Sequence, residues 1–144
     1  MNIARKIPTA ARIVLGLAFT VFGLNGFLHF LPQPPMSGPP AEFAGALAAT
    51  GYMFPLIKAT EVAAGLLLLS GRFVPLALTL LAPVLVNIVF FHAVLVKGGL
   101  ELPLTLLVAE VYLAWAYRDA FAPMLRGHVE PHVAAAPENR AATI

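Results

Sequence analysis

The chain has 144 residues, of which 60% are hydrophobic and only 11% are charged. Soluble domains carry about 25% charged residues, so this composition excludes a water-soluble globule and favours one membrane-embedded domain. Nine Lys and Arg against seven Asp and Glu give a formal net charge of +2, which gives no indication of nucleic-acid binding. The chain has no Cys, which excludes disulfides, thiolate catalysis and thiolate-bound metal centres.

The first apolar segment follows a basic N-terminus. Residues 1–12 include Arg5, Lys6 and Arg12 and no acid, and residues 13–31 contain no Asp, Glu, Lys or Arg. This stretch is long enough to cross a hydrocarbon core of about 30 Å. A cleaved signal peptide is the competing interpretation, because residues 46–48 resemble a cleavage site. We predict an uncleaved span, since the apolar segment exceeds the ~7–15 residues of a signal peptide and that site lies far downstream.

A proline-rich loop and three further apolar segments follow. The prolines of residues 31–41 prevent the first helix from continuing. Residues 42–50 are too few to cross, and they predict a short helix on the membrane surface. Residues 52–70, 73–96 and 102–117 each predict a span. The sequence therefore predicts an all-α integral membrane protein: a four-transmembrane-helix bundle over residues 13–117, a short surface helix in the first outer loop, and a largely flexible cytoplasmic tail over 118–144.

The positive residues predict the orientation of this bundle. If there are four spans, all basic residues outside them except Lys97 lie on one side of the membrane. These residues are Arg5, Lys6, Arg12, Arg72, Arg118, Arg126 and Arg140. The positive-inside rule then places both termini in the cytoplasm.

Polar and ionisable residues inside the predicted spans are the candidates for a ligand-binding site, because a charge in the hydrocarbon core costs about 2.5–3.5 kcal/mol on insertion scales. Lys58 and Glu61 form the sharpest pair, since residues three apart lie on nearly the same face of a helix. Glu61 could bind a substrate or move a proton with Lys58 tuning its charge. Alternatively, the two residues form an ion pair that fixes helix packing, or Lys58 extends to the outer interface and leaves Glu61 unpaired.

The other candidates are Asn25, His29, Asn87, His92 and Glu110. At about 1.5 Å per residue, the two asparagines fall near the depth of Lys58, where interhelical hydrogen bonding is the simpler role. The two histidines fall nearer the outer face, where an interfacial hydrogen bond is simpler than a metal or haem site. Glu110 is open to a functional or a structural interpretation.

Two further patterns predict packing rather than chemistry. Gly16, Gly23 and Gly26 in the first span, with Gly65 in the second, are expected to allow close approach of helices. His128 and His132 lie in the loose tail, and we predict no metal site there or elsewhere.

Four stretches together resemble the DoxX family of small bacterial membrane proteins. They are ARIVLGLAFTVFGLNGFLHFLP, KATEVAAGLLLLSGRFVPLAL, APVLVNIVFFHAVL and AEVYLAWAYRDAFAPML, within about residues 10–120. The resemblance implies a four-helix fold in the bacterial cytoplasmic (inner) membrane. Some relatives are linked to thiosulfate oxidation coupled to quinone, or to membrane redox complexes. Glu61 and Gly65 match the family pattern, but the resemblance supplies no catalytic residues, and a chain without Cys has no thiol for sulfur transfer.

The first functional hypothesis is therefore a subunit or partner of a membrane redox system, with quinone as the candidate cofactor near Glu61, Lys58, Asn25 and Asn87. A quinone carbonyl needs a nearby donor and proton source. The second hypothesis is a non-catalytic scaffold or binding protein, and a small transporter is the third. Besides the lipid bilayer, a redox partner protein and a second copy of the chain are the candidate partners, and whether the protein is an enzyme stays open.

Overall fold

The computed structural model describes residues 3–131, and every regular element in that part of the chain is a helix. The elements are α1 (Ile3–Leu28), α2 (Pro39–Ala49), α3 (Met53–Ser70), α4 (Val74–Phe90), the π-helix η1 (Phe91–Val96), α5 (Glu101–Ala116), α6 (Arg118–Phe121) and the 3₁₀ helix η2 (Ala122–Leu125). The part of the predicted tail that includes His132 and Arg140 lies outside the described residues.

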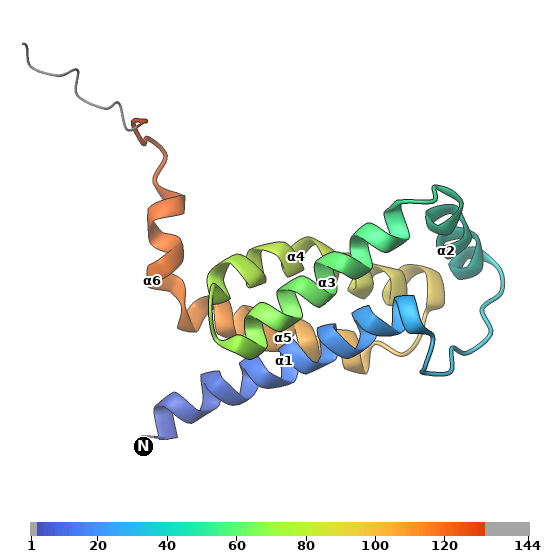
Figure 1. The fold of residues 1–144 in the computed structure, drawn as a ribbon, viewed down its shortest axis with the longest axis horizontal. Coiled ribbons are helices and arrows are strands. Elements are labelled where there is room, and N and C mark those ends of the chain that lie inside the picture. Colours follow the sequence, from blue (N-terminus) through green and yellow to red (C-terminus); the bar gives the residue numbers. More distant parts are fainter. Residues whose placement is uncertain (1–2, 132–144) are drawn as a thin grey trace, which may run out of the picture.

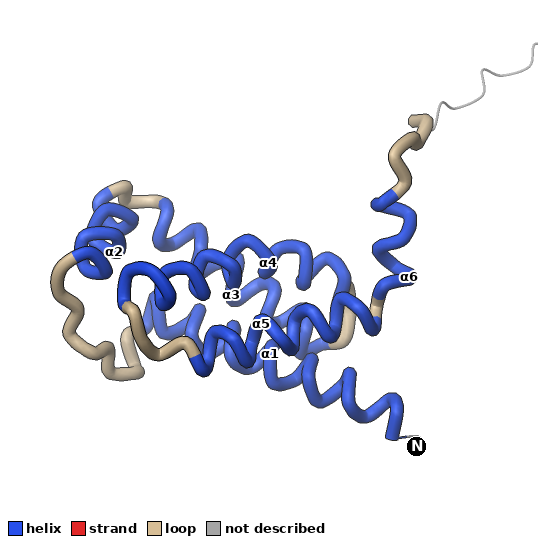
Figure 2. Tube along the Cα trace, turned by 180° about the vertical axis from the view of Figure 1, so that it is seen from behind, coloured by secondary structure: helices blue, strands red, loops and turns tan. Residues whose placement is uncertain are grey.

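Four helices pack side by side around an apolar core. Helix α1 contacts α3 and α5, and α4 contacts the same two helices (Figure 1; seen from behind in Figure 2). Each helix contributes fully buried side chains to the core, among them Leu15, Leu68, Leu81 and Leu113. The N-terminus, the turn between α3 and α4, and α6 lie at one end of the molecule, and α2 lies at the other (Figure 1).

Three of these helices are long and apolar enough to cross a membrane: Lys6–Leu28, Met53–Ser70 and Val74–Val96. Helix α5 has 16 residues. At about 1.5 Å per residue this gives about 24 Å, which is shorter than the hydrocarbon core of about 30 Å. The described residues therefore form an all-helical structure with three candidate membrane-crossing helices, while a fourth crossing by α5 stays a prediction. The membrane-surface position of α2 also stays a prediction.

The first helix begins and ends earlier than the predicted span of residues 13–31. It begins at Ile3, because the basic segment continues the helix through Pro8. It ends at Leu28, because His29 takes a left-handed backbone conformation with φ of 52° and the Leu31 amide donates to Asn25 Oδ1 at 2.6 Å. Capping by a side chain from the last turn thus ends the helix before the prolines are reached.

The third apolar segment is not one α-helix. Its last residues, Phe91–Val96, form a π-helix, and Lys97 then turns the chain with φ of 55°. His92 Nδ1 lies 2.9 Å from the carbonyl oxygen of Ile88. In an α-helix that carbonyl pairs with the backbone amide of His92, so a side-chain contact competes with the regular ladder where the helix widens.

Candidate functional site

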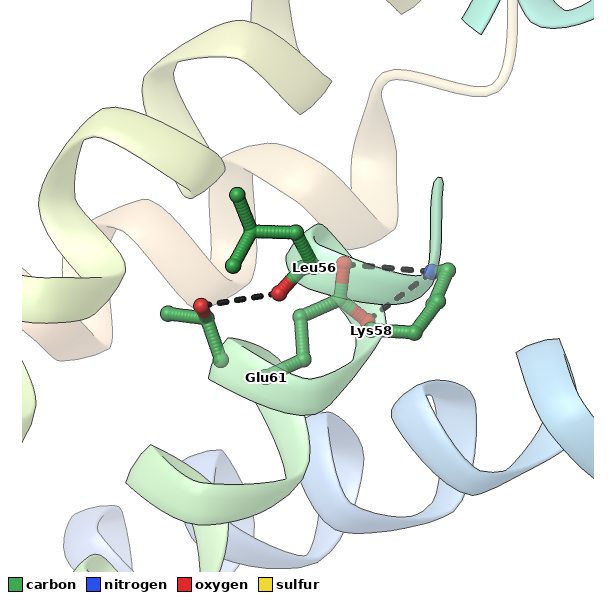
Figure 3. A network of polar contacts seen from close by, with 4 residues as sticks. Leu56, Lys58 and Glu61 are labelled. Atoms are coloured by element: carbon green, nitrogen blue, oxygen red, sulfur yellow. Dashed lines mark hydrogen bonds and ion pairs between the residues drawn. The ribbon is translucent and has the colours of Figure 1, made fainter. Parts of the chain in front are cut away.

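Lys58 and Glu61 form a complete ion pair on one turn of α3. Lys58 Nζ lies 2.9 Å from Glu61 Oε2 and 3.1 Å from Oε1, so both carboxylate oxygens accept a hydrogen bond (Figure 3). The Glu61 side chain is 3% exposed and that of Lys58 is 19% exposed. Lys58 Nζ also lies 5.6 Å from the centre of the Phe54 ring. The pair therefore satisfies its own charge within a single helix.

Helix α1 covers this pair through glycines. A Cβ added at Gly26 would lie 2.5 Å from Cδ of Lys58, and one added at Gly23 would lie 2.8 Å from Cγ2 of Val62 and 3.1 Å from Cβ of Glu61. Any side chain at these two positions would collide with α3. Because Gly23 and Gly26 have no side chains, α1 can lie directly against the pair.

The same two helices also approach closely at Gly16 and Gly65. A Cβ added at Gly65 would lie 2.9 Å from the carbonyl oxygen of Gly16, and 2.7 Å from the backbone nitrogen of Thr20. The prediction that these glycines allow close helix approach is confirmed. Thr20 Oγ1, which the sequence did not single out, is buried at this contact without a hydrogen-bond partner among the described residues.

Asn25 is buried, and its side-chain oxygen caps the end of its own helix. It is 2% exposed, and its Oδ1 accepts the Leu31 amide at the end of α1. The structure shows no hydrogen bond between Asn25 and Lys58 or Glu61 within residues 3–131. Asn25 thus makes a structural hydrogen bond, and its depth in the membrane stays a prediction.

Asn87 lies on an exposed face of α4. It is exposed, and it lines a cavity of about 230 Å³ with Phe43, Phe90, Phe91, Val94 and Leu95. This position separates Asn87 from the Lys58–Glu61 pair, which faces α1. The structure therefore does not bring the mid-depth polar residues into one centre.

The two candidate histidines lie where the helices end or change form. His29 is exposed and its amide donates to the carbonyl of Asn25, whereas His92 is half-buried and its ring contacts Phe91 edge-on. Within residues 3–131, no group of three or more His, Asp or Glu is placed to hold a metal ion.

Glu110 is the second buried acid, and its surroundings differ from those of Glu61. It is 5% exposed, and its Oε1 is buried without a hydrogen-bond partner among the described residues. It lines a groove of about 390 Å³ between α4 and α5. The other lining residues are Leu78, Thr79, Ala82, Val86, Leu107, Val111, Ala114 and Phe121.

Arg12 has a structural role that the sequence did not reveal. Its Nη1 donates to the carbonyl oxygens of Leu68 at 2.6 Å and Leu69 at 3.4 Å, at the C-terminal end of α3. A cation at this end of a helix pairs with free carbonyls and with the helix dipole. No local sequence signal predicts this contact, because Arg12 and Leu68 are far apart in the chain.

An all-helical chain with three helices able to cross a bilayer is a small multi-pass integral membrane protein. The family model DoxX matches residues 7–93, more than half of the chain, and the protein belongs to the DoxX family. The matched part includes the Lys58–Glu61 pair and ends before α5, so Glu110 lies beyond it. Comparisons with curated proteins and with solved structures gave no match.

Proposed function

We propose that this protein is a non-catalytic membrane scaffold in which the Lys58–Glu61 pair fixes α1 against α3. The proposal rests on one observation: both Glu61 oxygens are paired with Lys58, and Gly23 and Gly26 allow α1 to lie directly against the pair. A residue that binds a substrate needs a free polar atom and space beside it. Glu61 has both oxygens engaged, which favours a structural role.

The scaffold crosses the bacterial cytoplasmic membrane four times, with both termini in the cytoplasm. This part of the proposal is supported by the side chains at the two ends of the molecule. Arg12 and Arg118 lie at the end with the N-terminus and α6, and Lys97 follows η1 at the other end. Arg118 also lies 4.9 Å from the ring of Trp115, at the end of α5. An aromatic and basic pair is typical of a membrane interface, and α2 lies along the opposite interface.

A double-mutant cycle tests the structural role of the pair. Removing one partner of a buried ion pair costs about 3–5 kcal/mol, whereas replacing both by apolar residues is often neutral or stabilising. We expect Lys58→Met to be the more harmful single change, because it leaves the nearly buried Glu61 unpaired. Glu61→Leu should cost less, because the 19% exposed Lys58 can turn outward. The double variant should recover most of the stability.

The measurement is reversible unfolding in mixed micelles, with Glu101→Leu as the control because Glu101 is an exposed acid in α5. Single variants that keep wild-type stability would contradict the structural role. So would a double variant that is as unstable as the worse single variant.

The second candidate is a subunit of a membrane redox system that binds quinone near Glu61, Lys58, Asn25 and Asn87. One observation favours it: Lys58 is partly accessible, and its ammonium group has a third N–H that can donate a hydrogen bond to a quinone carbonyl. A redox partner protein or a second copy of the chain would then complete the system. The small-transporter alternative has no comparable support in the structure.

Mass spectrometry of the gently extracted protein separates the two candidates. A near-stoichiometric quinone that is lost in Glu61→Gln would favour the redox subunit. Bulk lipid alone in both preparations would exclude the quinone-binding form of that hypothesis and leave the scaffold.

A further inference from the structure

Glu110 has hydrogen-bonding capacity that its own protein does not use. Glu110 is 5% exposed, and its Oε1 is buried with no partner among residues 3–131. Buried polar atoms in native proteins almost always have a partner, which can be a bound molecule. No partner for this oxygen comes from the described residues, so a molecule that reaches Glu110 from outside can supply one.

The route to Glu110 is the groove between α4 and α5. Its volume of about 390 Å³ lies within the range of about 300–1,000 Å³ that is typical of ligand pockets. Leu78 and Val86 on α4 and Leu107 and Val111 on α5 make its walls apolar. Thr79 also lines it, but its hydroxyl already donates to the carbonyl of Pro75 at 2.9 Å. Glu110 is the one ionisable residue in this lining.

We propose that this groove binds a lipophilic molecule that carries a hydroxyl group, with the hydroxyl on Glu110 and the apolar body along the groove. An apolar pocket with one convergent polar group is the usual form of a small-molecule site. A hydroxyl both donates and accepts, so it pairs with the carboxyl group of Glu110 whether or not that group carries a proton. A neutral hydroxyl also costs less to bring into the hydrocarbon region than an ammonium. This site is independent of the scaffold role of Lys58 and Glu61.

Photo-crosslinking in phosphatidylcholine vesicles tests the proposal. The probe is a dodecanol with a diazirine on its alkyl chain, and the competitors are unlabelled dodecanol and its methyl ether, which cannot donate a hydrogen bond. We expect saturable labelling of peptides that cover residues 78–86 and 107–114. Dodecanol should displace the probe, and the ether should displace it less well, because only the hydroxyl can both donate to and accept from Glu110.

Two variants and a control sharpen the test. Glu110→Leu should lower the apparent affinity about tenfold, as expected for the loss of a hydrogen bond to a carboxylate. Ala82→Phe fills the groove from α4, where residue 82 is exposed, and it should abolish the saturable labelling. Glu101→Leu changes an exposed acid on the same helix and should bind as the wild type does.

Three results would overturn the proposal. Unsaturable labelling spread over all helices would mean that bulk lipid covers the groove. Equal displacement by the methyl ether, together with an unchanged affinity of Glu110→Leu, would mean that Glu110 anchors nothing. No labelling of the groove peptides at any probe concentration would mean that another occupant, such as a protein helix, covers the groove.

Discussion

Replacing Gly65 by Ala gives the most direct test of how α1 and α3 are held together. The added Cβ would lie 2.5 Å from Thr20 Oγ1, 2.7 Å from Thr20 N and 2.9 Å from the carbonyl oxygen of Gly16. Two of these three atoms belong to the backbone of α1, so no side-chain rotation relieves the clash and the helices must separate. Overpacking of this kind costs about 1–3 kcal/mol, and the rigid contacts place Gly65→Ala at the upper end.

The intrinsic helix preference of Ala offsets part of this cost. Ala is favoured over Gly in a helix by about 0.8–1.0 kcal/mol. The net loss of stability should therefore be about 2 kcal/mol. Gly45→Ala is the matched control, because Gly45 lies inside α2 and a Cβ there meets nothing within 4 Å. That variant gains the helix preference without the clash and should be as stable as the wild type or more stable.

The assay is unfolding in detergent followed by helical circular dichroism, with the fluorescence of Trp115, the single Trp of the chain, as a second probe. The order of stability should be Gly45→Ala, wild type, Gly65→Ala. Equal stability of the two alanine variants would refute the close contact of α1 and α3.

Two further predictions concern topology and helix ending. Because the chain has no Cys, single cysteines can be introduced in place of Lys6, Gly98 and Gly127 and tested with an impermeant maleimide in intact cells. Four crossings predict labelling at position 98 alone. Labelling at position 127 as well would show that α5 does not cross. Asn25→Leu should cost about 1–3 kcal/mol, because the Leu31 amide loses its acceptor, and hydrogen exchange at that amide should accelerate. Asn87→Leu removes an exposed amide and should change stability little, so equal effects of the two substitutions would contradict the capping role of Asn25.

Helix position and local pairing could be predicted from the sequence, because both depend on residues that are close in the chain. The apolar segments give the three membrane-crossing helices. The spacing of Lys58 and Glu61 within one turn of helix gives their ion pair, which forms with both carboxylate oxygens. The glycines of α1 predict the close contact with α3.

The rotation of each helix about its axis could not be predicted in the same way. In a soluble helix, polar residues mark the outer face. In a membrane the lipid-facing and the buried faces are both apolar, so a sequence such as that of α4 carries almost no signal for which side faces inward. Counting residues gave Asn25 and Asn87 similar depths, but depth does not fix direction. Asn25 lies inward and Asn87 lies on the outside of α4.

The hydrogen-bond partner of Glu61 could be predicted from the neighbouring sequence, whereas a partner for Glu110 could not. Glu61 has a lysine three residues before it, so its partner was already present on its own helix. The residues three and four positions from Glu110 are Leu106, Leu107, Leu113 and Ala114, none of which can donate a side-chain hydrogen bond. A partner for Glu110 must therefore come from another helix or another molecule, and among the described residues no other helix supplies one. Of these apolar neighbours, Leu107 and Ala114 line the groove beside Glu110, which is why a ligand in the groove is the partner that this arrangement favours.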